Sequence, residues 1–168
     1  MEALTRFTLA RHEGPYERWP LTSRLFLDGA DTGADVPGYV IEAQYRVDAG
    51  YLLVTSYDCL FEESNDFVLL APDFSVLGRA RLMVPYDTFL LHAHWPVSPA
   101  ALRLHYYENL FYTLVIERRT GWWRRGSWRL VLRRFDGVEG DPAAQRSLTD
   151  LRERLAQIGE RHKDAAGG

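Results

Sequence analysis

The stretch that most constrains the fold is residues 110–135, which has the pattern of a long β-hairpin. Its first half, Leu110–Ile116, carries no charged residue on either face of an extended chain. Such a run predicts a central strand that is covered on both sides. Its second half, Ser127–Phe135, alternates apolar residues with arginine, which predicts one buried and one exposed face. We therefore expect a β-sheet built outward from residues 110–116.

Turn-forming residues divide the rest of the chain into further short β segments. The clearest lies at 38–47, where apolar residues alternate with polar ones. Because side chains alternate between the two faces of a strand, this period of two predicts a strand with one face in solvent. Residues 29–38 are rich in Gly and Asp and predict a flexible connection. The expected strands cover residues 5–10, 24–28, 38–47, 51–57, 67–71, 76–82, 88–95, 102–107, 110–116 and 127–135.

The pattern changes after Phe135. Asp141 can cap a helix whose first residue is Pro142. Beyond it, one apolar stripe recurs at helical spacing, and it predicts an amphipathic helix over about 142–161. The stripe consists of Leu148, Leu151, Leu155 and Ile158. Because it spans only about three turns, too few for an independent coiled coil, we expect the helix to dock on its own domain. Residues 165–168 are expected to form a flexible tail.

Some ten short strands followed by one helix predict a mainly antiparallel β protein, with residues 1–164 in a single domain. A barrel or strongly curved sheet of calycin-like outline, with the helix packed on it, suits the hairpin connectivity. Closing a sheet in this way removes its exposed edges. A β-sandwich is the alternative architecture.

Composition limits the classes of protein to which the chain can belong. With 168 residues, 46% of them hydrophobic, the chain can build one core without disulfides, and its single cysteine, Cys59, excludes an internal disulfide. The N-terminus lacks the basic start and apolar core of a signal peptide, and no apolar run approaches the roughly 20 residues that span a bilayer. We expect a soluble cytoplasmic protein with no membrane span.

Charge is distributed unevenly along the chain. The net charge is −3, yet residues 117–135 hold seven arginines against Glu117, which gives this segment a charge of +6. The pI of about 5.9 lies far below the value above about 9 that is typical of nucleic-acid-binding domains. A nucleic-acid partner is therefore not expected.

The expected tip of the hairpin is Trp122, Trp123, Arg124 and Arg125. Trp and Arg are favoured anchors of protein interfaces, because they bury a large area and pair bidentately with acids. We therefore expect a binding or regulatory module of bacterial type, without catalytic residues or cofactor, that recognises a protein partner through this tip. In the alternative, the tryptophans pack within the domain and the arginines are solvated or pair with the acidic loop 58–66.

A second hypothesis involves three histidines. His92 and His94 are two residues apart on one expected strand, and His105 lies on the next, so all three are expected on one face together with Arg103. Three imidazoles on adjacent strands can bind Zn²⁺ or Fe²⁺. Arg103 would place a positive charge among these ligands, so the sequence favours the alternative of hydrogen-bonded histidines on a polar sheet face.

A third hypothesis is a cavity for a small apolar ligand inside the barrel. Tyr39, Tyr45 and Tyr112 are its expected lining, because they are large ring side chains on strands whose apolar faces are expected to point inward. Binding of lipid-like compounds would then stabilise the protein against heat.

Overall fold

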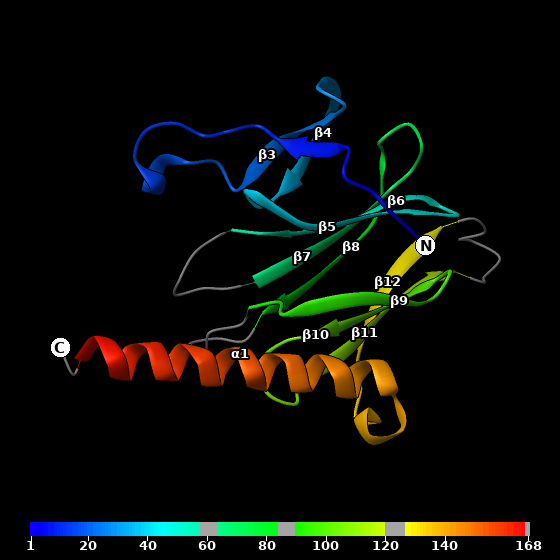
Figure 1. The fold of residues 1–168 in the computed structure, drawn as a ribbon. Helices are drawn as coiled ribbons and strands as arrows, with labels where there is room; N and C mark the ends of the chain where they lie inside the picture. Colours follow the sequence, from blue (N-terminus) through cyan, green and yellow to red (C-terminus); the bar gives the residue numbers. More distant parts are fainter. Residues whose placement is uncertain (58–63, 84–89, 120–126, 167–168) are drawn as a thin grey trace.

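The computed structural model describes residues 1–57, 64–83, 90–119 and 127–166 (Figure 1). Within these ranges the protein is mainly β, with antiparallel strands and one C-terminal helix, as the sequence predicts. The strands are β1 Glu2–Ala3, β2 Phe7–Leu9, β3 Thr22–Leu27, β4 Ala30–Pro37, β5 Val40–Val47, β6 Gly50–Ser56, β7 Ser64–Leu70, β8 Val76–Met83, β9 Ala93–Ser98, β10 Ala101–His105, β11 Phe111–Arg118 and β12 Trp128–Arg134. The helical elements are the 3₁₀ turns η1 Tyr16–Arg18 and η3 Val138–Gly140 and the helix α1 Pro142–Ala166.

The strands form three sheets instead of one continuous meander. A five-stranded sheet has the order β1-β5-β6-β7-β8, a four-stranded sheet has the order β12-β11-β10-β9, and a small sheet has the order β2-β3-β4. The small sheet lies on one side of the five-stranded sheet, the four-stranded sheet lies on its other side, and α1 lies beyond that (Figure 1). The prediction of a barrel is wrong, because the described strands form no closed barrel. Their layers are closer to the sandwich alternative.

The strands β6 and β7 explain why a single barrel wall does not suit this chain. Side chains alternate along each strand, so Leu52 and Leu69 enter the core between the two larger sheets, while Leu53 and Leu70 enter a second core under the small sheet. All seven residues of β7 are buried. The strands of a small barrel bury only the side chains that point into the barrel. Strands β6 and β7 are apolar on both faces, so a layer must pack against each face.

The core between the five-stranded and four-stranded sheets is called here the inter-sheet core. Its buried members come from both sheets: Ala43, Tyr45, Val47, Ala49, Leu52, Val54, Phe67, Leu69, Leu102, Leu104, Tyr106, Leu114, Ile116 and Leu130. On one side the two sheets approach closely, since a Cβ atom added to Gly78 on β8 would lie 3.7 Å from the backbone of β12. No ladder of hydrogen bonds joins β8 to β12 among the described strands.

The role expected for residues 110–116 is partly confirmed. Strand β11 is an interior strand, between β10 and β12, and its outer face is buried at Phe111 but only half-buried at Thr113, Val115 and Glu117. Leu114 and Ile116 enter the inter-sheet core, whereas Phe111 stacks on His105 on the opposite face. The strand whose residues are all buried is nevertheless β7. The sheets are therefore not built outward from residues 110–116.

The flexible connection expected at 29–38 is wrong, because this segment forms β4. Asp28 and Gly29 have positive φ angles of 51° and 81°, as a two-residue hairpin turn requires, and the turn joins β3 to β4. Arg24 on β3 lies 3.2 Å from Asp35 across the pair, so the acidic residues of β4 meet a cation. Composition alone hides this strand, because its stabilising partner lies on another segment.

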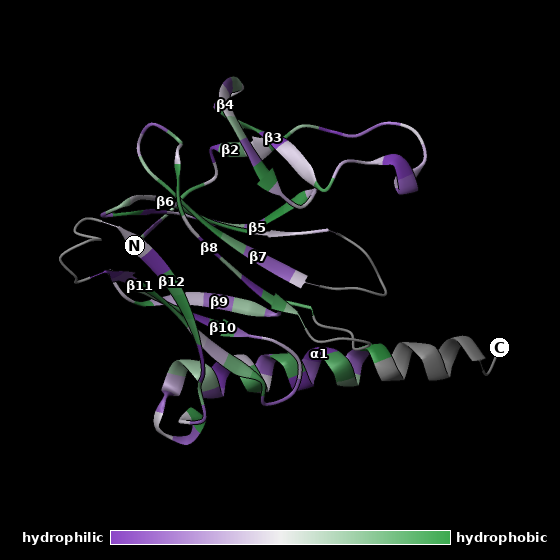
Figure 2. Ribbon diagram, turned by 180° about the vertical axis from the view of Figure 1, so that it is seen from behind, coloured by the Kyte–Doolittle hydropathy of each residue, from purple (hydrophilic) through white to green (hydrophobic). Residues whose placement is uncertain are grey.

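Helix α1 begins where the sequence predicts. Asp141 Oδ1 accepts hydrogen bonds from the backbone N–H groups of Ala143 and Ala144, at 3.0 and 3.2 Å, and caps the helix. The helix continues through Ala166, into the segment expected as a loose tail. Figure 2 shows hydrophobic and hydrophilic residues alternating along it. No helix among the described residues is long and apolar enough to cross a membrane.

Only the first half of the predicted apolar stripe on α1 is docked. Leu151 is buried and Leu148 is half-buried, whereas the side chains of Leu155 and Ile158 are 55% and 51% exposed. The helix runs past the edge of the four-stranded sheet (Figure 1), which leaves its later turns without a sheet beneath them.

Candidate functional site

The β11–β12 hairpin, which the sequence singles out, is anchored firmly in the molecule. Its ladder runs unbroken from the pair Tyr112–Arg134 to the pair Arg118–Trp128. One further backbone hydrogen bond, from Arg119 N–H to the carbonyl oxygen of Ser127 at 2.8 Å, extends the pairing. The inter-sheet core holds the inner face through Leu114, Ile116 and Leu130. The hairpin is therefore a rigid frame up to residues 119 and 127.

The outer face of the hairpin is defined by Glu117, Arg129 and Arg133, whose side chains alternate with the core residues of β11 and β12. Glu117 pairs with Arg129 at 2.5 Å and with Arg133 at 2.8 Å. Arg134 pairs with Asp136 at the end of β12. Among the described residues, Arg118 and Arg119 form no ion pair with an acidic side chain, so positive charge exceeds negative charge on the described part of this hairpin.

The four residues expected at the hairpin tip, Trp122, Trp123, Arg124 and Arg125, lie outside the described residues. One observation bears on the alternative, in which hairpin arginines pair with the acidic loop 58–66. Asp66 pairs at 2.9 Å with Arg81 on β8, and not with any of the hairpin arginines that the structure describes. The other acidic residues of that loop, Asp58, Glu62 and Glu63, also lie outside the described residues.

The three histidines do not share one face. Strand β9 begins only at Ala93, so the alternation assumed from the sequence does not reach His92. His94 pairs with Leu104 across the sheet and points into the inter-sheet core, where its Nδ1 atom lies 2.6 Å from the Tyr45 hydroxyl. His92 and His105 lie together on the opposite face, with ring centroids 5.1 Å apart. The expected common face is therefore wrong for His94.

His92 and His105 help to hold α1 on the sheet. His105 Nε2 donates to the backbone oxygen of Glu108 at 2.9 Å, and this leaves Nδ1 to accept from the Ser147 hydroxyl at 2.7 Å. His92 Nε2 lies 3.6 Å from Asp150 Oδ2. Burial lowers the pKa of His105, and the neighbouring His92 acts in the same direction. Both histidine side chains therefore contact α1 from the side of the four-stranded sheet.

The same histidines form no complete ligand set for a metal ion. In residues 1–57, 64–83, 90–119 and 127–166, no group of three or more His, Cys, Asp or Glu side chains is arranged to hold a metal. Arg103, expected beside the ligands, is buried near His105; its guanidinium lies 3.3 Å from Asp141 and 3.3 Å from the centre of the Phe135 ring. The arrangement matches the hydrogen-bonded alternative more closely than the metal site.

The three tyrosines expected around an apolar ligand are separated. Tyr45 belongs to the inter-sheet core and Tyr112 packs against it. Tyr39 lies elsewhere, because a break in the β5–β6 register between Ile41 and Ala43 reverses which face the earlier residues of β5 present. These tyrosines therefore do not line one cavity.

A largely half-buried cluster of rings surrounds Tyr39, and the sequence analysis misses it. The rings of His12, Tyr16, Trp19 and Tyr57 each lie within 5.2–5.7 Å of the Tyr39 ring. Tyr39 lies at the centre of the cluster. Its signal in the sequence is three ring side chains within residues 12–19, a segment where no strand or helix is expected.

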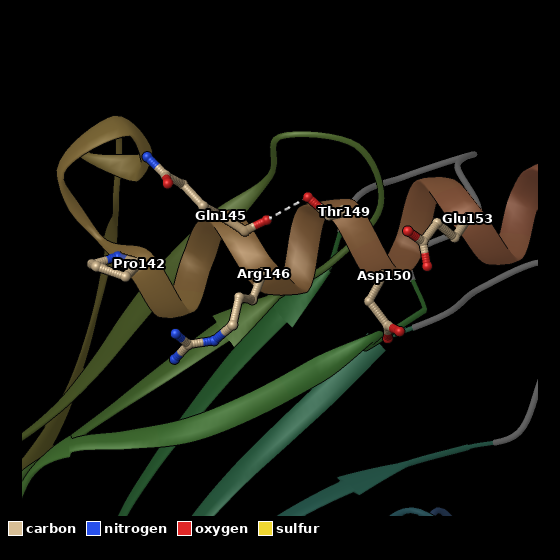
Figure 3. Close-up of a pocket in the computed structure, with 6 residues that line it drawn as sticks. All are labelled: Pro142, Gln145, Arg146, Thr149, Asp150 and Glu153. Carbon is tan, nitrogen blue, oxygen red and sulfur yellow. Dashed lines mark hydrogen bonds between the residues drawn. The ribbon is translucent and has the colours of Figure 1, made fainter.

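A shallow hollow of about 480 Å³ runs along α1, lined by Pro142, Gln145, Arg146, Thr149, Asp150 and Glu153. Figure 3 shows that all six residues belong to the helix and its first turn, with Arg146 and Asp150 directed toward the sheet. A ligand-binding cavity encloses most of its ligand and is largely apolar, whereas this hollow is open and polar. It has the character of a solvated groove beside a helix.

No protein-family model, curated protein or solved structure matches this chain. Among the surfaces of the described residues, the outer face of the hairpin combines a rigid frame with an unbalanced positive charge. It is the candidate functional site.

Proposed function

We propose that this protein is a non-catalytic binding module that recognises a protein partner through the β11–β12 hairpin. One observation carries the proposal: an arginine-rich hairpin is fixed in the inter-sheet core of a protein whose net charge is negative. A rigid frame lowers the entropy lost when a surface binds, and arginine is a favoured anchor of interfaces. The single cysteine fits a reducing compartment, so we place the module in the cytoplasm.

The described arginines support the proposal by their positions. The side chains of Arg129 and Arg133 are 51% and 62% exposed, and Arg118 is exposed at the end of β11. Trp122 and Trp123 follow Arg118 and Arg119 after two intervening residues in the sequence and would add apolar area to the interface. Such a combination of tryptophan and arginine is typical of the residues that dominate protein interfaces.

A capture experiment tests the proposal. Immobilised wild-type protein and the double variant Trp122→Ala/Trp123→Ala are incubated with a lysate of the source cells, and the retained proteins are quantified. We expect the wild type to retain specific proteins that the double variant retains at least about tenfold less, because truncating interface tryptophans removes dominant contacts.

A control variant and a stability measurement complete the experiment. Leu21→Ala removes an exposed apolar side chain far from the hairpin in sequence, and we expect it to retain the same proteins as the wild type. Unfolding of the double variant in urea should match the wild type within about 0.5 kcal/mol, as for other exposed sites. Equal retention by the double variant, or its failure to fold, would contradict the proposal.

A further inference from the structure

The carboxylate of Glu117 accepts hydrogen bonds from two arginines on the outer face of the hairpin. Glu117 Oε2 accepts from Arg129 Nε at 2.8 Å and from Arg129 Nη2 at 2.5 Å, and Oε1 accepts from Arg133 Nη2 at 2.8 Å. Glu117 and Arg129 are directly opposite in the ladder, and Arg133 lies four residues beyond Arg129 on the same face of β12. The two guanidinium groups therefore converge on one carboxylate.

The charges of this group do not cancel. Two guanidinium groups against one carboxylate leave a charge of +1, and each arginine keeps N–H donors that Glu117 does not use. The Glu117 side chain is 23% exposed, whereas the arginines are more than half exposed. An anion can therefore approach the arginines from solvent, at the place where the protein's own carboxylate is bound.

We propose, on the basis of the proposed function, that Arg129 and Arg133 bind an acidic segment of the partner, with a partner carboxylate exchanging for that of Glu117. The bound Glu117 shows which chemistry fits: a carboxylate is accommodated by both guanidinium groups at hydrogen-bond distance. In the free protein Glu117 holds the arginines in position and competes with the partner. The partner's binding segment is thus rich in Asp or Glu.

If Glu117 competes with the partner, removing its charge should increase the affinity for an acidic ligand. Replacing Glu117 with Gln keeps the shape of the side chain but removes its charge, so both guanidinium groups become available to an incoming carboxylate. An acidic ligand should then bind more tightly. A structural ion pair without this competition predicts a gain no larger than the loss of any other surface carboxylate gives.

The probe is a fluorescein-labelled poly-glutamate peptide, titrated at low ionic strength with fluorescence anisotropy as the readout. We expect wild-type protein to bind it, Arg129→Gln and Arg133→Gln each to weaken binding about tenfold, and Glu117→Gln to strengthen it about threefold. Arg18→Gln is the matched control. Arg18 is exposed in η1 and its substitution removes the same charge, so the affinity of this variant should stay within about twofold of the wild type.

Three outcomes would overturn the proposal: no binding by the wild type, equal weakening by Arg18→Gln, or unchanged or weaker binding by Glu117→Gln. A poly-glutamine peptide of equal length should not bind. These results are separate from the capture experiment, which relies on Trp122 and Trp123. Absence of peptide binding by the wild type, together with capture that depends on Trp122 and Trp123, would reject the acidic segment alone. Equal capture by the wild type and the double variant would reject the binding module.

Discussion

At the residue scale, the contact between Tyr45 and His94 joins the two larger sheets on the side away from β8 and β12. The Tyr45 hydroxyl lies 2.6 Å from His94 Nδ1, and the two rings meet edge to face. Removing the hydroxyl leaves a buried ring nitrogen without this partner. Tyr45→Phe should therefore lower the unfolding free energy by about 1 kcal/mol, measured by urea denaturation.

Tyr51→Phe is the control for this substitution. Tyr51 is half-buried, and its contacts among the described residues are made by its ring, against Phe7, Phe74 and Arg46. Loss of its hydroxyl should change the unfolding free energy by less than about 0.5 kcal/mol. Equal losses in both variants would show that the Tyr45–His94 contact contributes nothing specific.

The buried histidines should make stability depend on pH. Burial lowers the pKa of His94 and of His105 below their ordinary value. An unfolded histidine binds its proton near pH 6.5, so just below this pH the unfolded chain holds more protons than the folded one. The unfolding free energy should fall as pH drops below about 6.5. His94→Gln should make this fall shallower in urea titrations at several pH values; an unchanged slope would contradict the assignment.

At the scale of elements, α1 is a helix with two different halves. Leu151 is buried against the sheet, whereas Leu155, one turn later, is 55% exposed. Leu151→Ala should cost about 2–3 kcal/mol of unfolding free energy, and Leu155→Ala should cost less than about 0.5 kcal/mol. Urea denaturation of the two variants checks this contrast. Similar losses would mean that the helix docks along both halves.

Local signals in the sequence were sufficient for some elements. Asp141 and Pro142 define the start of α1 through short-range hydrogen bonds, so the sequence predicted that start correctly. The alternation in 38–47 likewise predicted β5. Features that depend on distant partners were missed. The start of β9 at Ala93 and the register break between Ile41 and Ala43 leave no local trace, and they separated His94 from His92 and Tyr39 from Tyr45.

For the candidate site, the sequence predicted an excess of arginine but not the arrangement of the side chains. The excess of arginine in 117–135 can be counted from the sequence, but its pairing with Glu117 depends on the register of β11 and β12. The ring cluster around Tyr39 was missed because its members come from separate segments, 12–19, 39 and 57. Sequence periodicity describes one segment at a time, whereas such clusters form between segments.

At the scale of the whole molecule, the protein is a stack in which the five-stranded sheet is covered on both faces (Figure 1). Neighbouring residues of β7 test this directly, since Leu69 enters the inter-sheet core and Leu70 enters the core under the small sheet. Leu69→Ala and Leu70→Ala should each cost about 2–5 kcal/mol in urea denaturation. A large loss in one variant and none in the other would indicate that one face is uncovered.

The location of the partner on the molecule is the most direct test of the proposed function. A photocrosslinking amino acid is placed at Arg118, exposed beside the outer face of the hairpin, or at Leu21, which is 73% exposed. The two proteins are illuminated in lysate, and adducts are identified by mass spectrometry. We expect discrete protein adducts from position 118 and none of the same adducts from position 21. The same adducts from position 21, with none from position 118, would contradict recognition through the hairpin.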